Sequence, residues 1–220
     1  MTVSLGRKAE FGDFVQEFRD LLVAHSGFLV AAIAVITASF VAWELLISQT
    51  SEFVVQLTVT IVGQFLVTER LLADRLPEGR GYRRFGSIFG SGFAGGLVIG
   101  IGLLLLIVPG IYLVGRLSAA VPIIVAENCR AIESLRASWD RTEQSKLPVF
   151  LLYVAAMVIW AGSIGLVLYL GIVDLGQAAT AALVALNLVV SVVTVLGWAL
   201  AAAVYRQITP TTSGLDEVFA

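Results

Sequence analysis

The sequence has very little of the chemistry that catalytic and metal-binding sites use. It contains one cysteine, one histidine and only 14% charged residues in a chain of 220. A single cysteine excludes an internal disulfide and a cysteine-cluster metal site, and no phosphate-binding loop, nucleotide fingerprint or nucleophile elbow is present. We therefore expect no catalytic residue, no metal site and no cofactor, and predict that the protein is not an enzyme.

Long polar stretches are also missing, which places the chain in a membrane. Hydrophobic residues make up 58% of it and the mean hydropathy is +0.93, far from the balance of soluble domains. The net charge of −2 gives no basic field for nucleic acid. The first apolar run is too long for a signal peptide, so we expect it to be retained. We predict one integral membrane domain over residues 1–220.

The apolar runs predict an all-α, polytopic membrane helix bundle of about six transmembrane helices, since a span needs roughly 20 mostly apolar residues. The expected spans are residues 27–48, 53–69, 92–108, 110–126, 147–171 and 178–205. Only Pro109 and Gly110 separate the third span from the fourth. These two short spans are either tilted interior helices or a hairpin that stops below the outer surface.

The basic residues indicate the orientation of the spans. If residues 92–126 cross the membrane and return, 13 of the 14 lysines and arginines fall on one side. The short connections at residues 48–52 and 173–177 contain none. The positive-inside rule then predicts a bacterial inner-membrane protein with both termini in the cytoplasm.

Two charged segments have the apolar spacing of amphipathic helices. They are residues 8–24 and residues 129–143, the second with Ile132, Leu135 and Trp139 on one face. We expect both to lie at the cytoplasmic interface with their apolar side chains toward the lipid. For the first helix, packing on the protein's own loops is the alternative.

The loop between the second and third spans is a candidate contact for lipid headgroups. It contains Arg80, Arg83 and Arg84 beside aromatic residues. A basic residue near an anionic membrane surface contributes about 1 kcal/mol to binding. These arginines either bind anionic lipid or serve only to set the topology.

Glycines recur at four-residue steps in the third span, at Gly92, Gly96 and Gly100. Such spacing lets two helices approach closely within a membrane. We expect this face to pack inside the protein. A homo-oligomer or a contact with another membrane protein is the alternative.

Charged residues inside membrane segments are rare, and Arg116 and Glu44 are the clearest examples here. If Gly110 lies near the outer surface, the helical rise places Arg116 about 9 Å deeper. Glu44 lies at a similar depth, so we predict an intramembrane ion pair between the two. The pair is either a structural clamp on the hairpin or the floor of an outward-facing polar cavity.

The segment from Pro109 to Ser145 contains a Pro-Gly-aromatic turn, an arginine, a second proline, a glutamate and a helix with Ser-Trp-x-x-Thr. The motif positions are Pro109, Gly110, Tyr112, Arg116, Pro122, Glu127, Leu135, Ser138, Trp139 and Thr142. This pattern resembles the glycerophosphoryl diester phosphodiesterase membrane-domain family and related uncharacterised bacterial six-span inner-membrane proteins. The resemblance implies a membrane region and no activity, because a separate domain carries the phosphodiesterase activity of the proteins that name the family.

We predict a non-enzymatic multi-pass inner-membrane protein that acts as an accessory or scaffold in envelope or lipid-related processes. The alternative is a small transporter or lipid-handling protein whose cavity is lined by Arg116, Glu44 and Gln64. Membrane-embedded catalysis is a third possibility. The expected partners are membrane lipids, anionic ones among them, and no nucleic acid.

Overall fold

The computed structural model describes residues 9–46, 52–76, 85–105, 107–173 and 179–209. Within these ranges the chain is helical and has no strand, which confirms the predicted all-α fold. The helices are α1 (Phe11–Ala24), α2 (Ser26–Leu46), α3 (Glu52–Leu71), α4 (Phe85–Leu105), α5 (Ile107–Leu117), α6 (Ala120–Glu127), α7 (Ala131–Arg141), α8 (Lys146–Val173) and α9 (Ala179–Ile208). Two single-turn 3₁₀ helices, η2 (Ala73–Arg75) and η3 (Glu143–Ser145), lie between them.

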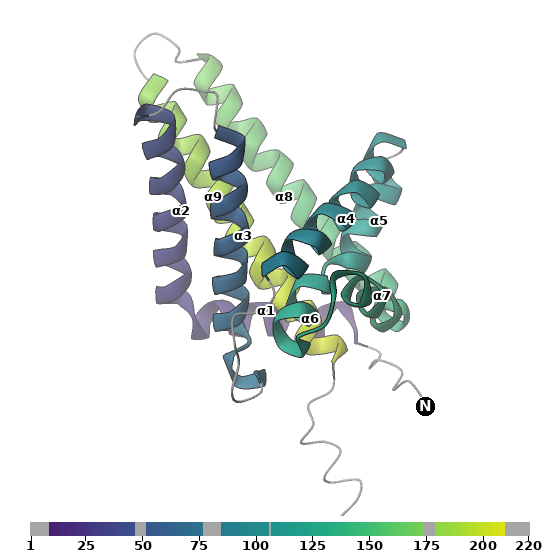
Figure 1. The fold of residues 1–220 in the computed structure, drawn as a ribbon. Helices are drawn as coiled ribbons and strands as arrows, with labels where there is room; N and C mark the ends of the chain where they lie inside the picture. The colour runs from purple at the N-terminus through teal and green to yellow at the C-terminus, as the bar shows by residue number, and fades with distance from the viewer. Residues whose placement is uncertain (1–8, 47–51, 77–84, 106, 174–178, 210–220) are drawn as a thin grey trace, which may run out of the picture.

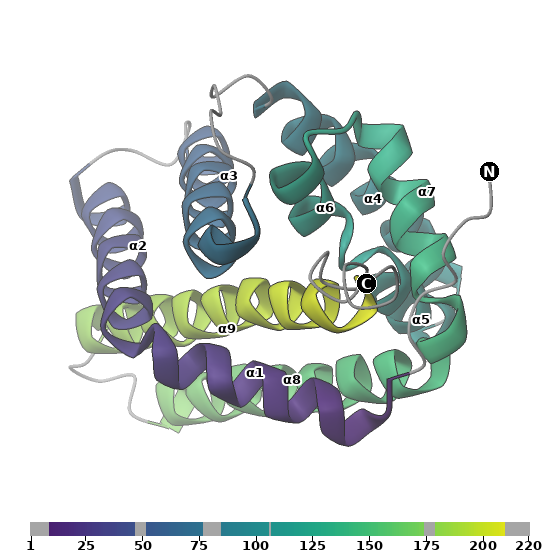
Figure 2. The same cartoon turned by 90° about the horizontal axis from the view of Figure 1, so that it is seen from below.

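The long helices form an upright bundle, and three shorter helices lie at its base (Figure 1). α2, α3, α8 and α9 belong to one group, and α4 and α5 form an antiparallel pair that packs on α8 through α5 (Figures 1 and 2). α1, α6 and α7 lie at the base. Because successive long helices reverse direction, α1 and the last turn of α9 lie at the same end of the bundle.

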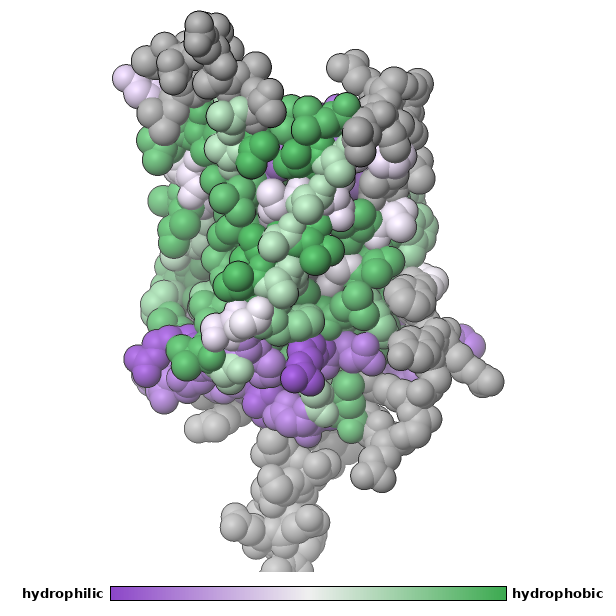
Figure 3. Space-filling model, turned by 90° about the vertical axis from the view of Figure 1, so that its left-hand side faces the viewer, coloured by the Kyte–Doolittle hydropathy of each residue, from purple (hydrophilic) through white to green (hydrophobic). Residues whose placement is uncertain are grey.

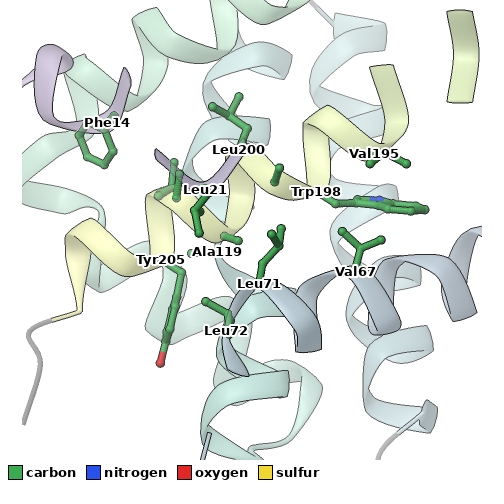
Figure 4. Packing of buried hydrophobic residues seen from close by; sticks show 14 of the residues in the cluster. Phe14, Leu21, Val67, Leu71, Leu72, Ala119, Val195, Trp198, Leu200 and Tyr205 are labelled. Carbon is green, nitrogen blue, oxygen red and sulfur yellow. The ribbon is translucent and has the colours of Figure 1, made fainter. Parts of the chain in front are cut away.

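The C-terminal half of α9 is the centre of the core. Every residue from Trp198 to Tyr205 is buried, and three of the four alanines in this stretch are fully buried. Small side chains let neighbouring helices approach closely, as membrane helix packing requires. Figure 4 shows side chains of α1 and α3, Leu21 and Leu71 among them, converging on this part of α9.

α1 is an amphipathic helix that packs against α8 and α9. Its N-terminus is capped, because the Glu10 backbone N–H donates to the Asp13 carboxylate at 2.9 Å. Phe14 and Leu21 are buried against the bundle, whereas Phe11 is 41% exposed. One apolar edge of the predicted helix therefore packs on the protein, on helices rather than loops, and another edge stays open.

The outer surface is apolar above a polar base. In Figure 3, hydrophobic residues cover the upright helices and hydrophilic residues form a band below them. Val30 of α2 and Ile159 of α8 are 65% and 67% exposed, although contact of such apolar side chains with water is unfavourable. A continuous apolar surface of this extent is a lipid-facing surface. The chain is therefore a membrane protein.

Four stretches of the described residues are long and apolar enough to cross a membrane. They are Ser26–Leu45, Val108–Glu127, Glu143–Tyr169 and Ala181–Ile208. The other two expected spans correspond to α3, with 20 residues, and α4, with 21 residues, of which Gly86–Gly102 is apolar. The predicted membrane helix bundle is confirmed.

The hairpin of α4 and α5 reverses at a different place from the predicted one. Pro109 and Gly110 lie in the first turn of α5 instead of between the two helices. Proline is tolerated there because the first N–H groups of a helix have no intrahelical acceptor. The two helices cross closely: a Cβ on Gly102 would lie 2.6 Å from Leu113 Cδ1 and 3.2 Å from Gly110 Cα.

Candidate functional site

A break between α5 and α6 places Arg116 at the base of the bundle. The predicted fourth span, residues 110–126, is therefore two short helices and not one. Pro122 accounts for the break, since it has no N–H for the Ser118 carbonyl and its ring would clash with that carbonyl in a continuous helix. The Ser118 hydroxyl donates to the Gly115 carbonyl at 2.8 Å and so completes the last turn of α5.

The Arg116 side chain is enclosed between α5, α7 and η3. It is only 1% exposed, and it is the largest fully buried side chain in the described part of the chain. Its guanidinium carbon lies 4.3 Å from the centre of the Trp139 ring and 5.9 Å from that of Tyr112. Nη2 forms an ion pair with the Glu143 carboxylate. Two aromatic rings, of which Trp139 is the nearer, and one carboxylate therefore hold the buried charge.

The main chain of Arg116 is held by two hydroxyl groups, one from Ser138 of α7 and one from Thr142, the residue that follows α7. Ser138, which is fully buried, donates to the Arg116 carbonyl oxygen at 2.8 Å. Thr142 Oγ1 lies 3.5 Å from the same oxygen and donates to the Ser138 carbonyl at 2.8 Å. The last carbonyl groups of a helix have no intrahelical donor. These two side chains therefore cap the C-terminus of α5.

Glu143 joins two cations at the edge of this cluster. Its carboxylate accepts from Arg116 and, at 2.8 Å, from the Lys146 ammonium. Glu143 and Lys146 are 53% and 54% exposed, in contrast to Arg116. Tyr112 closes the other side, with its ring 6.2 Å from those of both Trp139 and Phe150.

A second cluster joins α6, α7 and α9. Arg141 donates to both carboxylate oxygens of Glu127, one of the two bonds being 2.8 Å long. The Tyr205 hydroxyl donates to the same carboxylate at 3.2 Å. The hydrogen bond to Glu127 raises the pKa of the Arg141 guanidinium further above its usual value. Asn128 ends α6 in the left-handed conformation, with φ of 54°, which asparagine tolerates well.

A third cluster ties α1 and η2 to the end of α9. Arg206 donates to Glu17 at 2.6 Å and to Asp74 at 2.7 Å. Arg75 donates to the carbonyl oxygens of Arg206 and Thr209 at 3.2 and 3.0 Å, which caps the C-terminus of α9. Burial, followed by the nearby Arg206 charge, lowers the pKa of Arg75. The base of the bundle is thus cross-linked by charged groups.

The predicted ion pair between Arg116 and Glu44 is wrong. Glu44 accepts a hydrogen bond from Asn187 Nδ2 at 2.9 Å, and no ion pair within the described ranges joins it to Arg116. The predicted depth took Gly110 as the outer turn. Arg116 instead lies at the end of α5 that meets α7 at the base. Glu44 lies near the C-terminal end of α2, which is the end away from the base.

The glycine face of α4 is open, so the expectation that it packs inside the protein is also wrong. A Cβ on Gly92, Gly96 or Gly100 would meet no other atom within 4 Å. α4 uses a different face toward α7, where a Cβ on Gly95 would lie 3.5 Å from Leu135 Cδ2. A contact of the open face with a second copy or another protein stays a prediction.

The remaining sequence predictions concern lipid and metal. Arg80, Arg83 and Arg84, the expected headgroup contacts, lie outside the described residues. Among the residues that the structure does describe, no group of three histidine, cysteine, aspartate or glutamate side chains could hold a metal ion.

The sequence prediction missed Glu143 as the partner of Arg116. Trp139 and Glu143 are four residues apart, so they share a face of the predicted helix 129–143, and this spacing could have identified the pair. Tyr205 was also missed as a partner of Glu127. It gives no signal of its own, because it ends a long apolar run.

The residues of the Arg116 and Glu127 clusters fall within one family match, whereas Glu17, Asp74 and Arg75 of the third cluster lie outside it. The model described as the membrane domain of glycerophosphoryl diester phosphodiesterase matches residues 93–213, more than half of the chain. The match contains α5 to α9 and all motif positions from Pro109 to Thr142. No curated protein and no solved structure matches the chain.

Proposed function

The chain belongs to the glycerophosphoryl diester phosphodiesterase membrane-domain family, and on this premise we propose that it is a non-enzymatic accessory or scaffold protein in envelope or lipid-related processes. The observation that carries the proposal is that residues of the family motif bond to one another. Arg116, Ser138 and Thr142 form a closed joint between α5 and α7. Hydroxyl groups that bond to the main chain of a neighbouring helix hold the two helices together, which supports a structural use of the motif.

Four acidic groups of the base, Glu17, Asp74, Glu127 and Glu143, support the same function. Glu17 and Asp74 are paired with Arg206, Glu127 with Arg141, and Glu143 with Arg116 and Lys146. A general acid or base must be within hydrogen-bond reach of a substrate proton. Carboxylates that are committed to structural ion pairs are poor candidates for that role.

The transporter alternative lacks a supporting geometry. It required Arg116 and Glu44 to line one cavity, but the two residues lie toward opposite ends of the bundle. Arg116 is enclosed by protein groups, and Glu44 is bonded to Asn187. The accessory function needs no such cavity.

An activity assay on the purified chain tests the proposal. The protein in lipid nanodiscs is incubated with glycerophosphocholine and glycerophosphoethanolamine, and released glycerol phosphate is measured. We expect no product above protein-free nanodiscs. Turnover that disappears in Ser138→Ala would overturn the proposal. A deletion strain supplies the positive arm: its membrane lipid composition or detergent sensitivity should change, and the full chain should restore it.

We further propose that the chain is a multi-pass inner-membrane protein with both termini in the cytoplasm. The support is the position of the described basic residues, which lie on α1, η2 and α7 and at the base ends of α3, α5, α8 and α9. Cysteine labelling in a Cys129→Ser background tests it. Gly176→Cys, between α8 and α9, should react with an impermeant maleimide on intact spheroplasts, and Arg136→Cys only after permeabilisation. The reverse pattern would contradict the orientation.

A further inference from the structure

The cluster around Glu143 has more positive charge and more donors than its own residues use. Arg116 and Lys146 share the single Glu143 carboxylate, so two cations and one anion leave a net charge of +1. In the described part of the chain, Arg116 Nε and Nη1 are buried without a hydrogen-bond partner. Buried donors are normally paired, so the protein's own groups compensate the Arg116 charge only in part.

The other two clusters at the base have no surplus of positive charge, although Arg75 Nε in the third cluster is also buried without a hydrogen-bond partner. Glu127 and Arg141 pair one to one, and Tyr205 adds a neutral donor. In the third cluster, Glu17 and Asp74 balance Arg206 and Arg75. An anionic ligand therefore has a reason to choose the Glu143 cluster over its neighbours.

The Glu143 cluster also lies where a lipid headgroup would lie. Lys146 is the first residue of α8, which begins near the base of the bundle. Leu147 and Leu151, one turn apart on α8, are 62% and 46% exposed. Trp139 is 39% exposed on the neighbouring helix, and tryptophan is enriched at this depth in membranes.

We propose that this cluster binds the phosphodiester group of an anionic membrane phospholipid. A phosphodiester has one negative charge and two free oxygens, which match the net charge of +1 and the unused N–H groups of the exposed Lys146 ammonium. The acyl chains then follow Leu147 and Leu151 along α8. Arg116, behind Glu143, contributes its charge, and Glu143 competes with the phosphate for both cations.

The competition makes opposite predictions for two neighbouring residues. Lys146→Ala removes the exposed cation and should weaken binding of an anionic lipid roughly fivefold, the usual effect of one basic residue near the surface. Glu143→Gln removes the competing charge and should strengthen binding by a similar factor. Arg136→Ala is the matched control, because Arg136 is exposed on α7 and belongs to no ion pair within the described ranges.

Native mass spectrometry of the delipidated full chain tests the proposal. The probes are phosphatidylglycerol, phosphatidylcholine with the same acyl chains, and soluble glycerol 3-phosphate. We expect wild type to prefer phosphatidylglycerol, Lys146→Ala to lose the preference, Glu143→Gln to increase it and Arg136→Ala to retain it. Thermal unfolding of each variant shows that it is folded.

A second measurement locates the bound lipid. In a variant whose only tryptophan is Trp139, brominated phosphatidylglycerol should quench the fluorescence more than brominated phosphatidylcholine does, and Lys146→Ala should remove the difference. Equal affinities of Lys146→Ala and Arg136→Ala for phosphatidylglycerol would overturn the proposal. Displacement of the lipid by glycerol 3-phosphate, at a concentration equal to the dissociation constant of the lipid, would assign the site to a soluble phosphate. That result would also overturn the proposal.

Discussion

Replacing Arg116 by methionine is expected to change the stability of the fold little, although Arg116 is the largest fully buried side chain among the described residues. The change removes a desolvated cation–π contact with Trp139, which contributes about 2 kcal/mol. It also removes an ion pair with the half-exposed Glu143, which contributes about 1 kcal/mol. Against this loss, the substitution removes two donors, Arg116 Nε and Nη1, that are buried without hydrogen-bond partners.

Each of those donors costs about 1–3 kcal/mol while it stays unpaired in the protein interior. Their removal offsets the roughly 3 kcal/mol that is lost. The hydrogen bonds from Ser138 and Thr142 survive, because they go to the backbone carbonyl of residue 116. We therefore expect the free energy of unfolding of Arg116→Met to lie within about 1 kcal/mol of the wild-type value, or above it.

Removing the partner instead of the arginine should have the opposite effect. Loss of one member of a fully buried pair costs about 3–5 kcal/mol. Glu143 is 53% exposed, so water reaches the position that its carboxylate leaves, and we expect Glu143→Ala to cost about 2 kcal/mol. For a chain of this size that corresponds to a fall of roughly 4–8 °C in the unfolding midpoint.

Thermal unfolding of the purified chain in one detergent, followed by circular dichroism, measures both variants and the double variant. In the Arg116→Met background, Glu143→Ala should cost less than about 0.5 kcal/mol, because no buried charge remains to be stranded. A larger fall in midpoint for Arg116→Met than for Glu143→Ala would refute the reasoning. It would mean that the arginine stabilises the joint more than its unpaired donors weaken it.

Three further substitutions test other parts of the fold. Gly102→Ala should destabilise by about 1–3 kcal/mol because its Cβ would press on Leu113 and the Gly110 backbone, whereas Gly96→Ala, in open space, should be neutral in the same thermal assay. Ser138→Ala should cost about 1 kcal/mol through the lost bond to the carbonyl of α5, and equal midpoints for Ser138→Ala and wild type would contradict the capping role. Arg206→Met should speed hydrogen exchange of the α1 amides, because it removes the ion pair between Glu17 and α9 and leaves only the 3.2 Å bond from Gln207, while exchange in α8 should not change.

The long helices could be predicted because lipid leaves the chain few choices. A segment that crosses a membrane must satisfy its own backbone, so an apolar run of sufficient length is a helix. The bounds of α2, α3, α8 and α9 lie within three residues of the predicted spans. The amphipathic segments were also predicted, since a periodic apolar face fixes a helix even where no span is long enough.

The position of the hairpin turn could not be predicted, because proline is compatible with two local structures. It ends a helix that it would interrupt, and it also suits the first turn of a helix that it begins. Pro109 does the second, and Pro122 does so again at the start of α6. The prediction chose the first for Pro109, and this moved Arg116 toward the wrong end of the bundle.

The wrong partner for Arg116 was predicted because Arg116 and Glu44 were matched by their depth in the membrane alone. Depth does not determine on which side of the bundle a residue lies. The motif Ser-Trp-x-x-Thr, read with the following glutamate, supplies that position. Ser138 and Thr142 lie four residues apart and meet the carbonyl at the end of α5, which sets how α7 crosses it. Trp139 and Glu143 have the same spacing one residue later, so the same crossing brings both to the Arg116 guanidinium. The hydroxyl pair therefore determines the ion pair.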